Sequence, residues 1–211
     1  MKKNIAELIS SKCRFFENYF ETSLNFADKK IYQVYLTQTY YYVKQSCRLL
    51  KKAGEATQNE VLKTAFLSHV DEEMGHEHLA AKDYMTLTGG IVSDYPELDG
   101  TKNFWQSIDA SIDADPLSML GYALALEFLA INCAKALIDR ASKFGDGCIQ
   151  FLLEHYELDQ DHTEKMMLLL DSLNQEELQS VHHFTDLSFS NFHTMCEGIR
   201  RYATSEKAKV A

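Results

Sequence analysis

The sequence is poor in the residues that break or redirect a chain. It has only two prolines, Pro96 and Pro116, and nine glycines in 211 residues. This leaves little material for turns and favours long helices. No stretch alternates between apolar and polar residues as a half-buried strand does, so the sequence argues against a sheet.

Paired cysteines are also missing. The five cysteines are odd in number, contain no CxxC pair and are widely spaced, at Cys13, Cys47, Cys133, Cys148 and Cys196. This argues against a disulfide framework and against a zinc ribbon. It fits free, mostly buried thiols in a reducing compartment, and we expect a cytoplasmic protein.

Basic charge is in deficit, and there is only one long apolar run. The 21 lysines and arginines are outnumbered by 31 acids, for a formal net charge of −10, which argues against nucleic-acid binding.

Glu7 and polar neighbours interrupt the N-terminal segment, so we expect no signal peptide. The run 116–138 is nearly long enough to span a bilayer, but it contains Glu127, Asn132 and Lys135. We therefore expect a buried core helix and no membrane partner.

The length fits a single domain over residues 1–211, and no linker or internal repeat divides it. Periodicity and punctuation predict seven helical stretches, at about 4–27, 30–53, 58–87, 103–113, 115–144, 148–173 and 174–203. The expected architecture is an all-α bundle. We expect the polar tail, about 204–211, to fray.

Three helix starts carry capping signals. Thr57 with Glu60 and Asn174 with Glu177 have the residue types of capping boxes. Asp115 is placed to cap the helix that begins at the following proline. These signals predict where the third, fifth and last helical stretches begin.

The segment "HVDEEMGHEH" is the densest polar cluster of the third stretch. In a continuous helix, His69, Glu73 and His76 extend an apolar stripe and should point inward. Asp71 and His78 fall on a more solvated face. A single inward histidine is more often a satisfied core residue than a ligand, and this is our reading of His69 taken alone.

Two later helices place polar groups on apolar faces. Glu127 lies among apolar or small neighbours, so it should be hydrogen-bonded, ion-paired, protonated or bound to metal. A plain ion pair with lysine or arginine across the core is the alternative. His155, Asp159 and His162 are spaced by four and three on one apolar stripe. Three polar side chains on one buried face are much harder to supply with hydrogen-bond partners than a single one, unless a ligand binds them.

Together the inward set holds three carboxylates, three imidazoles and no thiolate: Glu73, His76, Glu127, His155, Asp159 and His162. Such a mixed set suits iron or manganese, and could hold two ions ~3.5–4 Å apart with bridging carboxylates. Structural zinc more often uses cysteine, and calcium uses oxygen ligands only.

These residues resemble the haem-oxygenase-like diiron oxidases and oxygenases, whose fold is shared by the TenA and PqqC proteins. That family places a Glu and a His on one helix, a Glu on a later helix, and then H-x3-D-x2-H. The six residues above match those slots. The resemblance implies a seven-helix haem-oxygenase-like bundle with a ferrous cofactor. This cofactor would be two iron ions, with manganese as an alternative at one of the two sites. It also implies reaction with dioxygen, a small organic substrate and a homodimer.

The first ligand pair is open, because some members separate their Glu and His by seven positions, as Asp71 and His78 are here. His69 and Glu72 are further substitutes, or groups that orient ligands. Some members also consume one of their own tyrosines. Tyr35 and Tyr42 are candidates for tyrosines in the pocket, with aromatic core packing as the alternative.

Other classes remain to be weighed. A TenA-like thiamin-related hydrolase would need a nucleophilic cysteine in its pocket, and Cys133 is the only one near a candidate ligand. A true haem oxygenase would carry a histidine on its first helix, but none precedes His69. A ferritin-like diiron protein would need a further Glu from its first helix. A non-catalytic interaction protein that keeps the fold is the remaining alternative. We expect an iron-dependent oxidase or oxygenase.

Overall fold

The computed structural model describes residues 1–205, and the described chain is built from helices alone. Its α-helices are α1 (Lys2–Thr22), α2 (Lys29–Val43), α3 (Ser46–Ala56), α4 (Glu60–Glu73), α5 (Glu77–Thr88), α6 (Asp99–Ala114), α7 (Leu117–Ala141), α8 (Gln150–Leu169) and α9 (Gln175–Thr204). Short 3-10 turns lie between them. Most of the tail that we expected to fray, residues 206–211, lies outside the described residues.

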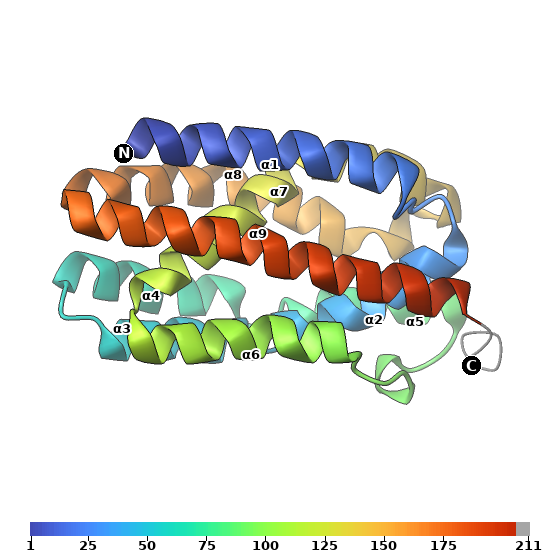
Figure 1. The fold of residues 1–211 in the computed structure, drawn as a ribbon. Coiled ribbons are helices and arrows are strands. Elements are labelled where there is room, and N and C mark those ends of the chain that lie inside the picture. Colours follow the sequence, from blue (N-terminus) through green and yellow to red (C-terminus); the bar gives the residue numbers. More distant parts are fainter. Residues whose placement is uncertain (206–211) are drawn as a thin grey trace.

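α7 is the central helix of the bundle. It packs against α8, α9 and α1, which run along the length of the molecule (Figure 1). α7 and α9 approach so closely that a Cβ at Gly121 would lie 2.7 Å from Cβ of Phe184. Among the described helices, only the segment Leu117–Phe144 is long and apolar enough to cross a membrane, and 67% of its most apolar window is buried inside the bundle. Its apolar surface is used to form the core, as predicted.

The predicted helical stretches are all present, but two of them are divided. The stretch predicted as one helix over 58–87 ends at Glu73 and resumes at Glu77. The cause is Gly75, whose φ of +90° is incompatible with a continuing α-helix and costs a residue without Cβ little. The stretch predicted over 30–53 is divided by a tight turn at residues 44–45 into α2 and α3. Both single-helix predictions were therefore wrong in this detail.

One of the three predicted caps is confirmed in full and a second in part, because α7 begins at Leu117 and Pro116 is the residue in its cap position. Asn174 and Glu177 form a capping box at the start of α9. The Oδ1 atom of Asp115 accepts a hydrogen bond from the backbone N–H of Leu117. The prediction for Thr57 was wrong, because the side chain of Asn59 caps α4 instead.

Candidate metal centre

Side chains from α4, α7, α8 and the start of α5 meet in one buried cluster. Their donor atoms form three overlapping groups, and the atoms of each group lie within 4.8 Å of one another. The groups are His69 with Glu73 and His162, Glu73 with His76 and His155, and Glu127 with Asp159 and His162. The structure thus brings together all six residues predicted as ligands, and it adds His69 to them.

The alternative first pair lies apart from this cluster. Asp71 and His78 are exposed, and the side chain of His78 is 77% exposed. The side chains of Glu73 and His76 are only 12% exposed. The pair spaced by three is therefore the one that reaches the cluster, although His76 does so from beyond the helix break rather than along a continuous face.

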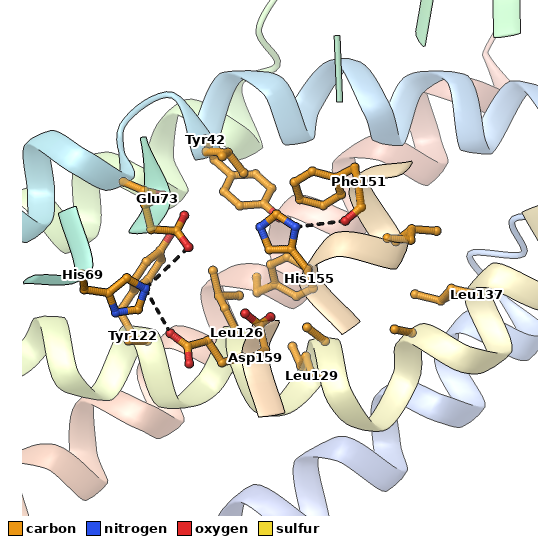
Figure 2. A pocket seen from close by; sticks show the side chains of 18 of the residues that line it. Tyr42, His69, Glu73, Tyr122, Leu126, Leu129, Leu137, Phe151, His155 and Asp159 are labelled. Carbon is orange, nitrogen blue, oxygen red and sulfur yellow. Dashed lines mark hydrogen bonds and ion pairs between the residues drawn. The ribbon is translucent and has the colours of Figure 1, made fainter. Parts of the chain in front are cut away.

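α8 presents its three polar groups from one uninterrupted helix. Nδ1 of His155 lies 2.9 Å from the carbonyl oxygen of Phe151, one turn earlier, and donates its proton there (Figure 2). That hydrogen bond leaves the lone pair of Nε2 free for the cluster. Further along, Nδ1 of His162 lies 3.3 Å from Oδ1 of Asp159. Both of these residues are almost fully buried.

The first turn of α8 is fixed by an acid that the sequence analysis missed. Asp83 on α5 is fully buried, and its two carboxylate oxygens accept the backbone N–H groups of Gln150 and Phe151 at 3.0 and 2.8 Å. It acts as an N-cap supplied by another helix. Burial nevertheless raises the pKa of Asp83 to about 6. Asp83 therefore links α5 to the turn whose Phe151 carbonyl orients His155.

Glu127 enters the cluster from the middle of α7. Its Oε1 lies 3.5 Å from Nε2 of His69, and its Oε2 lies 3.9 Å from Nδ1 of His162. No lysine or arginine of the described chain lies within ion-pair distance, so the alternative of a plain ion pair was wrong. Burial, with the nearby carboxylates of Asp159 and Glu73, raises the pKa of Glu127 well above its usual range. A carboxyl group in this setting either keeps its proton or binds a cation.

Glu73 is placed at the other side, between two imidazoles. Its Oε1 lies 3.5 Å from Nε2 of His69 and 3.6 Å from Nδ1 of His76 (Figure 2 shows the first of these contacts). Burial opposes ionisation of Glu73, but the two histidines outweigh it and lower its pKa. The cluster therefore combines an ionised carboxylate with a second acid, Glu127, that resists ionisation.

Glu72 lies outside this cluster and contacts one of its members. Its Oε2 lies 2.9 Å from Nε2 of His162, and its Oε1 lies 3.4 Å from Nζ of Lys165. A carboxylate that holds one ring nitrogen of a histidine fixes the tautomer and turns the other nitrogen toward a metal. Of the two roles predicted for Glu72, the geometry fits the orienting one.

The residues fit a metal, because the buried atoms without partners converge here. Six buried side-chain nitrogen or oxygen atoms of the described residues have no hydrogen-bond partner, and three are in this cluster: Nδ1 of His76, Oε2 of Glu127 and Nδ1 of His162. Buried polar atoms without partners are costly, so native proteins rarely keep them. Metal ions in the two donor groups that contain these atoms would satisfy all three, and the mixture of nitrogen and oxygen donors suits iron or manganese.

An apolar cavity adjoins the cluster. Tyr35 and Tyr42, the two candidates for pocket tyrosines, line it, and so does Tyr122 on α7, which no sequence motif indicated. Burial raises the pKa of all three phenols, so they are neutral donors at physiological pH. The only sequence signal for Tyr122 was its place on a face of α7 next to that of Glu127.

Cys133 does not line this cavity, and neither does any other cysteine of the described chain. Cys133 is buried, and burial raises the pKa of its thiol. A neutral thiol away from the pocket has neither the position nor the charge state of a nucleophile.

A helical bundle around a buried carboxylate and histidine cluster defines a class of proteins built to hold transition-metal ions. Within that class, the chain belongs to the family of iron-containing redox enzymes, which it matches over residues 33–187. The matched range contains every residue of the cluster. No curated protein matches the chain.

Solved structures identify the fold. A domain of unknown function with a heme oxygenase-like fold from Shewanella denitrificans superposes with a TM-score of 0.80 at 20% identity, over 91% of this chain and 90% of that one. Two structures of a CADD-like protein of unknown function from Nostoc punctiforme give TM-scores of 0.70 and 0.68 at 14% and 13% identity. They cover 93% and 94% of this chain, and 99% and 97% of theirs. The predicted haem-oxygenase-like all-α bundle is therefore confirmed.

Proposed function

We propose that this protein is a non-haem, iron-dependent oxidase or oxygenase that holds two irons and uses dioxygen to oxidise a small organic substrate. The observation that carries the proposal is the convergence of His76, Glu127 and His162, each with an unpartnered buried atom, in one cluster of donors. Two of the overlapping groups share Glu73, and a carboxylate has two oxygens with which it could serve neighbouring ions. Manganese at one of the two positions fits the same donors.

The chemistry of the side chains determines which roles fall to the iron and which to the protein. Iron, when bound, supplies the redox chemistry with dioxygen that these side chains cannot perform alone. Glu73, His76, Glu127, His155, Asp159 and His162 hold the ions, and His69 is a further donor beside them. Burial raises the pKa of Glu127, and a bound cation would favour its ionised form. The phenols of Tyr35 and Tyr42 face the substrate and can supply a hydrogen atom or a proton.

The test is an anaerobic titration of the metal-free protein with ferrous ion, followed by a pulse of dioxygen. We expect about two irons per chain and an absorbance transient that depends on dioxygen. If iron binds no better than background, and Asp159→Ala and His162→Ala behave as the wild type does, the proposal is wrong.

The alternative of a TenA-like hydrolase makes an opposite prediction for Cys133. Because this thiol is buried away from the cavity, Cys133→Ser should leave any iron-dependent turnover intact. Loss of turnover with iron binding preserved would instead favour cysteine chemistry. A non-catalytic interaction protein would bind iron without any transient.

The setting of the protein is also a proposal. We infer a cytoplasmic homodimer whose partners are a small-molecule substrate and dioxygen, with neither nucleic acid nor membrane among them. The net charge of −10 supports the absence of nucleic acid. Light scattering of the purified protein at several concentrations tests the dimer, and a single-chain mass throughout would refute it.

A further inference from the structure

The cavity continues beyond the cluster along one stripe of α7. After Glu127, the residues of α7 that line it include Ala130, Ala134 and Leu137, at spacings of three, four and three. These spacings place all four on one face of the helix. Ten residues of α-helix are ~15 Å long. Figure 2 shows Leu137 at the end of the cavity opposite His69.

This extension, from Ala130 to Leu137, is an arm with small residues on its α7 side. Beyond Glu127, four α7 residues line the cavity. Ala130 and Ala134 contribute only a methyl group each, and Leu129 and Leu137 contribute larger apolar side chains. The opposite walls carry larger apolar side chains, among them Phe20 of α1 and Phe151 of α8. The arm is therefore enclosed by apolar side chains, and the side chains that line it are smallest at the two alanines.

Charge is confined to the other end of the cavity. All its acids and histidines belong to the metal cluster, and no lysine, arginine, asparagine or glutamine of the described chain lines it. A charged group in the arm would be buried without a counter-charge, at a large cost in free energy. At the cluster, three carboxylates facing two divalent cations would leave one net positive charge. That end tolerates a neutral or singly anionic group, and Oε2 of Glu127, buried and unpartnered, marks it as the polar end.

We propose that the substrate is an amphipathic molecule with one polar end at the metal cluster and one slender, uncharged aliphatic arm along Ala130, Ala134 and Leu137. The inference rests on the proposed function for the identity of the polar end, but the arm itself is a property of the cavity. Ala130 and Ala134 are the residues that set the length of arm accepted. Amino acids and other substrates charged at both ends are disfavoured, because the second charge would lie in the arm.

The experiment measures binding of a series of n-alkanols, about six to about twelve carbons long to bracket the ~15 Å of the arm. Calorimetry is performed on metal-free protein, so that binding is read without turnover. For the wild type we expect affinity to rise roughly fourfold per added methylene until the arm is filled, and then to level off. Ala134→Phe should move this levelling-off to shorter alkanols, and Ala130→Leu should do the same less strongly.

Ala136→Phe is the matched control, because Ala136 lies on the same helix but is exposed. Circular dichroism and ferrous titration of each variant show that the fold and the cluster survive. If Ala134→Phe does not fold, Ala130→Leu against the control decides the question.

An affinity independent of chain length in the wild type, no binding of any alkanol, or equal effects of the cavity variants and the control would overturn the proposal. Its failure is separable from that of the proposed function. If the protein binds iron but its affinity for alkanols does not depend on their chain length, only the proposal for the arm is wrong. If the affinity for alkanols depends on chain length but the protein does not bind iron, the proposed function is wrong and the proposal for the arm stands.

Discussion

The two sides of the buried carboxylate and histidine cluster are built in different ways. On one side, α8 carries His155, Asp159 and His162 on a single face of a continuous helix. On the other, Glu73 ends α4 and His76 precedes α5, with Gly75 between them at a positive φ. α8 packs against the central helix, whereas α4 packs mainly against α3. One side is thus fixed by helical register and the other by a local break.

This difference determines what each side depends on. The α8 side depends on side chains alone, because the helix would hold their spacing without the cluster. The α4–α5 side depends also on the backbone, because the helix is broken between Glu73 and His76 and the turn at Gly75 sets their relative position. Substitutions on the two sides should therefore fail for different reasons, and four of them test this.

The largest effect is expected on the α8 side. Asp159→Ala removes a buried donor that lies within reach of Glu127 and His162. We expect iron affinity to fall by more than about 100-fold at one ion at least, because changes that only perturb ligand orientation already cost about 10–100-fold. Ferrous titration measures it. Asp161→Ala, an exposed acid of the same helix, is the control, and an equal loss there would refute the assignment.

The α4–α5 side is tested by two neighbouring acids. Glu73→Ala should lower iron affinity by a similar factor, roughly 100-fold at one ion, since Glu73 belongs to two of the donor groups. Asp71→Ala should leave the titration unchanged, because its side chain is exposed. The reverse result would assign the ligands to the pair spaced by seven instead.

A substitution of Glu72 tests whether this carboxylate orients His162. Glu72→Gln removes the carboxylate charge 2.9 Å from Nε2 of His162, and we expect about a tenfold loss of iron affinity with the fold unchanged. Lys165→Met serves as the comparison, because its ion pair with Glu72 is largely exposed and should contribute little. If both variants titrate as the wild type does, Glu72 does not position His162.

The smallest effect is expected from the backbone. Gly75→Ala forces a residue with a Cβ to a φ of +90°, which should destabilise the protein by about 1–2 kcal/mol and weaken iron binding several-fold. Gly198→Ala is the matched control. It lies within α9, where an added Cβ would meet no atom within 4 Å, and should stabilise by about 0.5–1 kcal/mol. Thermal melts measure the stability of both variants. If Gly198→Ala were also destabilised, the effect of Gly75→Ala could not be assigned to its positive φ.

The same difference explains how far the sequence could predict the structure. The α8 triplet and Glu127 required only helical periodicity and the presence of polar groups on apolar faces, and both were placed correctly. His76 was expected at the cluster by extending a helix that in fact ends at Glu73. A glycine followed by polar residues does not reveal from sequence alone whether a helix continues, because the positive φ is selected by tertiary contacts.

Residues that act across helices were harder to predict. Asp83 accepts the N–H groups of α8 from α5, and Tyr122 lines the cavity from α7. Neither has a local motif, since each role depends on how two helices pack. His69 was predicted only as a core residue when taken alone, or as a substitute or orienting group beside the six ligands, for the same reason. Its place between Glu73 and Glu127 follows from the approach of α4 to α7, which periodicity within one helix cannot give.

The most direct test of the central claim is a crystal structure of protein loaded anaerobically with ferrous ion, with anomalous scattering recorded at the iron absorption edge. The account predicts two peaks inside the cluster, with Glu73, Glu127 and Asp159 among the residues that contact them. A peak bound by Asp71 and His78, or no peak within reach of His155 and His162, would contradict it.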